Sequence, residues 1–214
     1  MRVVVLGAAG QTGRLVVDGL VTLGHDVRAV VRRDDQAGAA ATRGAAAFVA
    51  DIAQLGPSEM AELFDGADAA VWAAGSGYGD DPELVDGDAC IAAQQAADEA
   101  GVARWVQISS MYADRPEMGP PFLQPVLRAK HRSDVAVTQT GLGWTVIRSG
   151  GMTNDIGTGQ VFLGSMLDSG TVARADVAAV ALACLTTPSA ACSAFDLVSG
   201  MTPVDVALAA HASE

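Results

Sequence analysis

The fold of this 214-residue chain is decided by the stretch Val3-Val4-Val5-Leu6-Gly7-Ala8-Ala9-Gly10-Gln11-Thr12-Gly13. After Arg2, the residues Val3 to Leu6 form an aliphatic, mainly β-branched run, which is typical of a strand buried on both faces of a sheet. Three glycines follow at the spacing G-x-x-G-x-x-G. From Gln11 to Leu23 the apolar residues recur at helical intervals. The stretch predicts a strand over residues 2–6, a tight glycine turn and a helix that ends before Gly24.

The three glycines of this turn have different physical tasks. Gly7 permits the tight turn, Gly10 lets the backbone approach a pyrophosphate, and Gly13 allows the helix to pack closely on the strand. The following helix N-terminus offers unpaired N–H groups and the positive end of its dipole. The turn therefore predicts a dinucleotide site, to which we assign Ala9, Gln11 and Thr12 as well. The alternative is a tight turn with no ligand.

Apolar runs alternate with helical patterns along the whole chain, which indicates a doubly wound parallel sheet, the Rossmann fold. We expect one domain over residues 1–214, with a small C-terminal lobe around Gly150 to Leu167. The first helix should bury Leu15, Val16, Leu20 and Leu23 on one face. Further strands are expected over residues 26–31, 46–50, 68–74, 104–109, 144–148 and 195–198, and further helices over residues 58–64, 86–101, from about 125, and 174–185.

The composition excludes several classes of protein. Half of the residues are apolar and 18% are charged, which is enough apolar material for a folded core. The net charge of −12 disfavours binding to nucleic acid or to an anionic membrane surface. Three cysteines, Cys90, Cys184 and Cys192, lie far apart and form no metal-ligand spacing. We expect buried thiols, no metal site and a cytoplasmic location.

The residues at the end of the second expected strand bear on whether the site binds NAD(H) or NADP(H). A site for NAD carries a carboxylate there for the ribose 2′-hydroxyl, whereas a site for NADP carries arginine for the 2′-phosphate. In this chain Val31 leads directly into Arg32 and Arg33, and the acids Asp34 and Asp35 come afterwards. The pair favours NADP(H) over NAD(H). In the alternative interpretation the loop is merely solvated and Asp34 binds the ribose.

With this glycine turn and this second strand end, the chain resembles the short-chain dehydrogenase/reductases. Within them it resembles the atypical branch of NAD(P)-binding epimerases or dehydratases, which has NmrA-like and flavin-reductase-like relatives. The resemblance implies a strand order 3-2-1-4-5-6-7 and an adenine contact at Asp51 and Ile52. It also implies cofactor contacts at several strand ends and one helix. The resemblance is carried by the segments Ala73-Ala74-Gly75, Ile108-Ser109-Ser110, Leu127-Arg128-Ala129-Lys130 and Val146-Ile147-Arg148-Ser149-Gly150-Gly151, where relatives usually have Pro at the position of Ser149. The cofactor contacts it implies within them are Ala73, Ala74, Gly75, Ser109, Lys130, Ser149 and Gly150.

The catalytic signature of that family is Tyr-x-x-x-Lys with an upstream Ser, and it is incomplete here. Lys130, the single lysine of the chain, is present, but Val126 stands where the tyrosine belongs. The resemblance implies that Lys130 binds the nicotinamide ribose and that Ser110 (or Ser109) binds a substrate carbonyl. Tyr112 is a candidate substitute acid, and Tyr78 is the only other tyrosine.

Two further residues lie next to these candidates in the sequence. Asp86 resembles the acid that this branch carries in place of the usual active-site Asn, but it is also a good helix N-cap, which we favour. His131 points about 100° away from Lys130 around a helix and is expected at the surface.

Two classes of function remain open. The first is an oxidoreductase that passes hydride between NADP(H) and a quinone, flavin or small carbonyl compound. The second is a non-catalytic module that senses NADP(H) and acts through a protein partner, and an epimerase or dehydratase is a further alternative. We expect a monomer or a homodimer.

Overall fold

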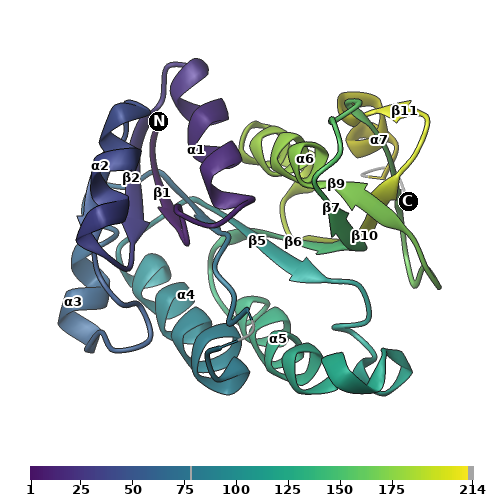
Figure 1. Ribbon diagram of the computed structural model, residues 1–214, viewed down its shortest axis with the longest axis horizontal. Helices are drawn as coiled ribbons and strands as arrows, with labels where there is room; N and C mark the ends of the chain where they lie inside the picture. Colours follow the sequence, from purple (N-terminus) through teal and green to yellow (C-terminus); the bar gives the residue numbers. More distant parts are fainter. Residues whose placement is uncertain (78, 212–214) are drawn as a thin grey trace.

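The computed structural model describes residues 1–77 and 79–211 and contains a nine-stranded sheet between two layers of helices (Figure 1). The strand order β3-β2-β1-β4-β5-β6-β10 confirms the expected order 3-2-1-4-5-6-7, and all these strands run parallel. They are β1 (Arg2–Leu6), β2 (Asp26–Val31), β3 (Ala46–Val49), β4 (Ala69–Trp72), β5 (Arg104–Ser110), β6 (Gly143–Ser149) and β10 (Ser193–Ser199).

Alternation along β1 shows why both faces of the sheet are covered. Val3 and Val5 lie in one apolar cluster, whereas Val4 and Leu6 lie in a second cluster on the opposite face. The first cluster is covered by α1 (Gly13–Thr22), α2 (Asp34–Thr42), α6 (Arg174–Thr186) and α7 (Val204–His211), and the second by α3 (Pro57–Glu62), α4 (Cys90–Glu99) and α5 (Gln124–Val137). This confirms the doubly wound fold.

The C-terminal part adds strands beyond the parallel core. β8 (Gln160–Gly164) pairs antiparallel with β10 and with the short β11 (Thr202–Pro203), so part of the expected lobe belongs to the main sheet. β7 (Gly151–Thr153) pairs with β9 (Thr171–Ala173) in a separate two-stranded sheet. Among residues 1–77 and 79–211, no helix has the length and apolar character that crossing a membrane requires.

Some local expectations were wrong. Helix α2 was not expected, because its sequence is nearly uniform in small and polar residues and it buries only Ala40. Leu23 was expected in the core but is 63% exposed, since α1 ends at Thr22 and Leu23 is the C-cap residue. Gly24 does adopt the expected left-handed conformation, with φ +76°. Cys90 and Cys184 are buried, but Cys192 is exposed.

Asp86 does not cap the N-terminus of a helix, so that expectation was also wrong. The chain enters α4 through a seven-residue π-helical segment, Glu83–Ala89, and Asp86 lies in its middle. Its side chain is directed into the protein, where it is 1% exposed. Short π-helical segments occur often at functional sites, because the extra residue redirects side chains.

Candidate functional site

A first cavity, of about 260 Å³, lies where β1, β2 and β4 end. It is lined by most residues that the sequence assigned to the adenosine and phosphate part of a dinucleotide: Gly7, Ala9, Gly10, Arg32, Asp51, Ile52, Ala73, Ala74 and Gly75. The carboxyl ends of the strands thus bring together segments from four parts of the chain, as the doubly wound topology requires.

The glycine turn of this cavity leaves no space for side chains at two positions. A Cβ at Gly7 would lie 2.6 Å from the backbone of Ala74, and Gly7 has φ +78°. A Cβ at Gly13 would lie 2.2 Å from the carbonyl oxygen of Gly7. Gly13 does not line the cavity and serves the packing of α1 on β1. The turn therefore exposes backbone and the start of α1 to the cavity, and the residues present fit a diphosphate.

At the end of β2 the two arginines have different surroundings. Arg32 lines the cavity together with Gln36, and its Nη1 forms an ion pair of 2.8 Å with Asp80 on the loop after β4. Arg33 pairs with Asp35 at 2.9 Å and is not among the described residues that line the cavity. Arg32 is therefore the better placed of the two for a phosphate.

The acidic residue that directly follows the two arginines does not line the cavity, so it gives no support to a carboxylate contact with the ribose in place of an arginine contact with a 2′-phosphate. Asp34 is exposed and is not among the described residues that line the cavity, which leaves the alternative of a ribose contact at Asp34 without support. Asp51 lines the cavity after β3, and its Oδ1 accepts a hydrogen bond of 3.2 Å from the N–H of Ala53. Its second carboxylate oxygen remains available to a donor such as an adenine amino group.

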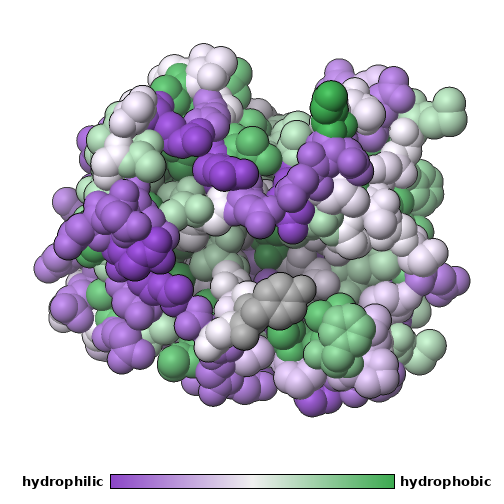
Figure 2. Space-filling model, viewed as in Figure 1, coloured by the Kyte–Doolittle hydropathy of each residue, from purple (hydrophilic) through white to green (hydrophobic). Residues whose placement is uncertain are grey.

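A second cavity, of about 780 Å³, continues from the first, because Ala73, Ala74 and Gly75 line both. Figure 2 shows the molecule hollowed in the middle of this view, with hydrophilic side chains along the upper rim. The sequence-predicted residues that line the second cavity are Gln11, Thr12, Ser109, Ser110, Tyr112, Lys130, Ser149 and Gly150. One continuous groove thus contains every candidate except Gly13 and Arg33.

Lys130 lies in this cavity with its charge neutralised by Asp86. The Nζ of Lys130 is 2.8 Å from Oδ1 of Asp86, and the side chains are 14% and 1% exposed. Oδ2 of Asp86 accepts a hydrogen bond of 3.0 Å from the N–H of Ser76, and Lys130 Nζ donates a longer one, 3.5 Å, to the carbonyl of Ile108. The pair joins α5 to the π-helical segment beside the cavity.

The pair stays charged around neutral pH. Burial by itself would lower the pKa of Lys130, but the charge and hydrogen bond of Asp86 outweigh it and raise that pKa above its ordinary value. Burial would likewise raise the pKa of Asp86, but Lys130 and Ser76 lower it overall. Lys130 is therefore a fixed cation and hydrogen-bond donor, and a poor proton source at neutral pH.

The position of the missing tyrosine is confirmed in space. Val126 lies one helical turn before Lys130 on α5, and both side chains line the second cavity. Tyr112 also lines it, with φ +70°, but its hydroxyl donates a hydrogen bond to the carbonyl of Asp168. Ser110 is half-buried, and its Oγ donates to the carbonyl of Met111 at 3.2 Å. Tyr78, the other tyrosine, lies outside the described residues.

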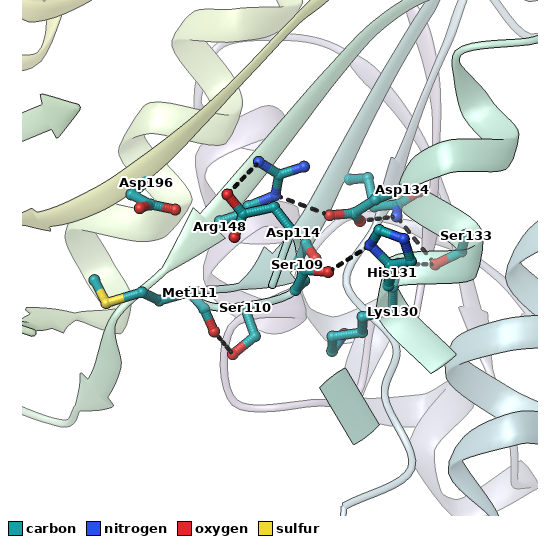
Figure 3. Close-up of polar contacts among 12 residues, drawn as sticks. Ser109, Ser110, Met111, Asp114, Lys130, His131, Ser133, Asp134, Arg148 and Asp196 are labelled. Carbon is teal, nitrogen blue, oxygen red and sulfur yellow. Dashed lines mark hydrogen bonds and ion pairs between the residues drawn. The ribbon is translucent and has the colours of Figure 1, made fainter. Parts of the chain in front are cut away.

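Behind Ser110 a set of buried and half-buried charges connects the ends of β5 and β6 to α5 (Figure 3). Arg148 contacts Asp134 of α5 at 3.1 Å and Asp114 at 3.6 Å, and Arg115 contacts Asp114 at 2.9 Å. Burial raises the pKa of Asp134 although Arg148 opposes the shift. These ion pairs join the end of β6 and the loop that follows Ser110 to α5.

His131 belongs to this support and not to the surface, so the expectation of a surface position was wrong. Its Nδ1 lies 2.8 Å from the carbonyl oxygen of Ala113, and the side chain is half-buried. The reason is that the loop after β5 folds back over this face of α5. Helical periodicity gives the direction of a side chain but not what packs against it.

Several cavity residues were not identified from the sequence, among them Gln36, Asp80 and Val85 of the first cavity. They lie in the loops and helices that follow β2 and β4, and a single sequence does not predict the path of these segments. For Asp86 a signal existed, because its resemblance to the family's acid pointed to the site, but the helix-cap interpretation was preferred.

Comparisons with known proteins agree with this geometry. Residues 7–188 match the family described as NAD(P)H-binding. A protein of Bacillus subtilis (strain 168) named "Uncharacterized sugar epimerase YhfK" is 37% identical over 212 residues, which cover 97% of this chain and 99% of that protein.

Two solved structures resemble the whole chain. One, from Bacillus halodurans, is described as an NAD-dependent epimerase/dehydratase; it is 29% identical with a TM-score of 0.92 and covers 98% of this chain and 99% of its own. The other, the oxidoreductase ylbE from Lactococcus lactis, is 25% identical with a TM-score of 0.89 and covers 100% and 98%. With a family match over most of its length and a glycine turn at the head of the groove, the chain belongs to the NAD(P)H-binding family.

Proposed function

We propose that this protein is an NADP(H)-dependent oxidoreductase that transfers hydride between the nicotinamide and a small acceptor, namely a quinone, a flavin or a carbonyl compound. The observation that carries the proposal is the buried Lys130–Asp86 pair with Val126 beside it. The chain keeps the cation that would bind the nicotinamide ribose. It lacks the phenol at the position from which the family transfers a proton.

The first cavity would hold the adenosine half of the cofactor. Arg32 would bind the 2′-phosphate, since a guanidinium forms two parallel hydrogen bonds with phosphate oxygens. Asp51 and Ile52 would hold the adenine, and the start of α1 would bind the diphosphate. These roles would favour NADP(H) over NAD(H).

The second cavity would hold the nicotinamide half, which supplies or accepts the hydride when bound. Lys130 would donate hydrogen bonds to the ribose hydroxyls, and Asp86 fixes the position of its ammonium group. Ser110 would rotate its hydroxyl toward the oxygen of an acceptor. Val126 would contribute an apolar wall beside the reacting atoms.

The source of the proton that the reduced acceptor takes up determines which acceptors suit this cavity. Lys130 keeps its proton at neutral pH because Asp86 raises its pKa, and the hydroxyl of Tyr112 is bonded to a backbone carbonyl. A quinone or flavin whose reduced form takes its proton from water suits this cavity better than a ketone, which needs a positioned acid.

Epimerisation or dehydration is the second candidate, because the relatives from Bacillus subtilis and Bacillus halodurans carry those names. Such reactions begin with removal of a proton from a substrate hydroxyl, for which Tyr112 would have to leave Asp168. A non-catalytic sensor of NADP(H) is the outcome that the missing tyrosine would favour. As part of the proposal we expect a cytoplasmic monomer or homodimer that binds a small molecule and no nucleic acid.

A turnover screen tests the proposal. NADPH and NADH are each incubated with the protein and with quinones, flavins, aldehydes and nucleotide sugars, and both cofactor consumption and product are measured. We expect NADPH consumption with a quinone or flavin, its loss in Lys130→Met, and little change in Arg128→Met, which removes an exposed charge outside the cavity lining. Conversion of a sugar without net cofactor consumption would favour the epimerase, and NADPH binding without any turnover would favour the sensor.

A further inference from the structure

A second cation lines the larger cavity, and the proposed transfer of hydride does not use it. Arg174 is the first residue of α6 and lies half-buried in the cavity wall. Its Nη1 donates hydrogen bonds of 3.0 Å to the carbonyl of Met152 and 3.0 Å to Oδ1 of Asn154. Both acceptors are neutral, so they orient the guanidinium without cancelling its charge.

The other cations beside this cavity are paired with carboxylates. Lys130 contacts Asp86, and Arg115 and Arg148 contact Asp114. In the part of the chain that the structure describes, no carboxylate lies within ion-pair distance of Arg174, although Asp168 lines the same cavity. A half-buried, oriented and uncompensated arginine is the usual means of binding a carboxylate or phosphate.

The other residues of the cavity wall indicate the polarity of the rest of the ligand. The side chains that border the space between Val126 and Arg174 are mainly apolar and include Met111, Pro120, Leu123 and Met152. The two oxygens that hold Arg174 come from the segment at β7, on the side of the cavity formed by β7 and β9. This side adjoins the glycine turn, since the hydroxyl of Thr12 donates a hydrogen bond of 3.4 Å to Sδ of Met152, so a test of Arg174 has to separate a substrate anion from the cofactor diphosphate.

We propose that Arg174 binds an anionic group of the substrate, so that the acceptor is an apolar molecule carrying a carboxylate or a phosphate. This inference rests on the proposed function for the identity of the cavity as a substrate site. The anion would fix the orientation of the acceptor through the fork of Arg174. The apolar body would then extend toward Val126 and the nicotinamide.

Calorimetric titration tests the proposal without requiring turnover. The protein saturated with NADP⁺ is titrated with 2-naphthoate, 2-naphthyl phosphate and the neutral 2-naphthamide. We expect at least one anion to bind about tenfold or more tightly than the amide, a preference that Arg174→Met abolishes and Arg128→Met retains. Affinity for NADP⁺ itself should stay the same in Arg174→Met.

Other outcomes overturn the inference. If neither anion binds better than 2-naphthamide, Arg174 has no role in ligand selection. If Arg174→Met weakens NADP⁺ binding by the same factor as binding of the anions, Arg174 contacts the cofactor diphosphate instead. A preference for anions that depends on Arg174 in a protein that consumes no NADPH would refute the oxidoreductase while keeping the anion site.

Discussion

Replacing Asp86 by Asn should destabilise the protein strongly, because it leaves the charge of Lys130 buried without a partner. The Lys130 side chain is 14% exposed, and its other contact is a long hydrogen bond to the carbonyl of Ile108. Breaking a buried ion pair from one side costs about 3–5 kcal/mol. That is a large part of the roughly 5–15 kcal/mol by which a domain is stable.

A second replacement, at Lys130, separates the energy of the ion pair from effects of its surroundings. Lys130→Met in the Asp86→Asn background removes the stranded charge and keeps a side chain of similar length, so we expect most of the loss to be recovered. Urea unfolding of the wild type, both single variants and the double variant at pH 7 gives the coupling energy. Asp88→Asn is the matched control, because Asp88 forms an exposed ion pair with Arg132, which is worth less than about 1 kcal/mol.

Two results would refute this reasoning. One is that Asp86→Asn lowers the free energy of unfolding no more than Asp88→Asn does. The other is that the effects of Asp86→Asn and Lys130→Met add in the double variant, which would mean that the two side chains do not interact in solution.

Three further predictions concern the reaction, the cofactor and the ion pair of Lys130 and Asp86. Val126→Tyr places a phenol one helical turn before Lys130, and it should gain or raise NADPH-dependent reduction of small aldehydes, measured as alcohol formed; no gain would place Val126 away from the reacting atoms. Arg32→Ala should weaken NADPH binding about tenfold or more in calorimetry and leave NADH binding nearly unchanged. Arg33→Ala should have a smaller effect, and Asp80→Asn should strengthen NADPH binding because it releases Arg32; equal effects at Arg32 and Arg33 would contradict the assignment. Since the pKa of Asp86 is lowered and that of Lys130 is raised, their contribution to stability is present above the ordinary aspartate pKa and below the ordinary lysine pKa. The coupling energy of the pair, measured by urea unfolding, should therefore be flat between about pH 5 and pH 9 and fall only when Asp86 takes up a proton below about pH 4; a midpoint near neutral pH would show that another group controls the contribution of the pair to stability.

The sequence predicted the parallel core and its order because each strand leaves a local pattern. The aliphatic run before Gly7 and the glycine spacing are properties of neighbouring residues, and the cavity forms wherever parallel strands end. The antiparallel additions β8 and β11 left no such pattern. β8 pairs with β10 and with β11, and α6 separates it from both in the chain.

The site was predictable as a set of residues but not as a set of interactions. The spacing between Val126 and Lys130 fixed a shared helical face. The contacts of Arg32 with Asp80 and of Lys130 with Asp86 join segments separated by more than 40 residues, and no local pattern encodes them. Asp86 illustrates the limit, since a good N-cap residue can also be the carboxylate that a π-helical segment directs inward.

We propose that the two cavities together bind one molecule of NADP(H), with Arg32 at the adenosine end and Lys130 at the nicotinamide end. Calorimetric titration of the wild type and of Lys130→Met with NADPH, NADH and 2′,5′-ADP, which carries only the adenosine end, tests it directly. We expect the wild type to bind NADPH more tightly than NADH, and Lys130→Met to weaken NADPH binding while leaving 2′,5′-ADP binding unchanged. Equal affinities for NADPH and NADH in the wild type, or an unchanged affinity for NADPH in Lys130→Met, would contradict it.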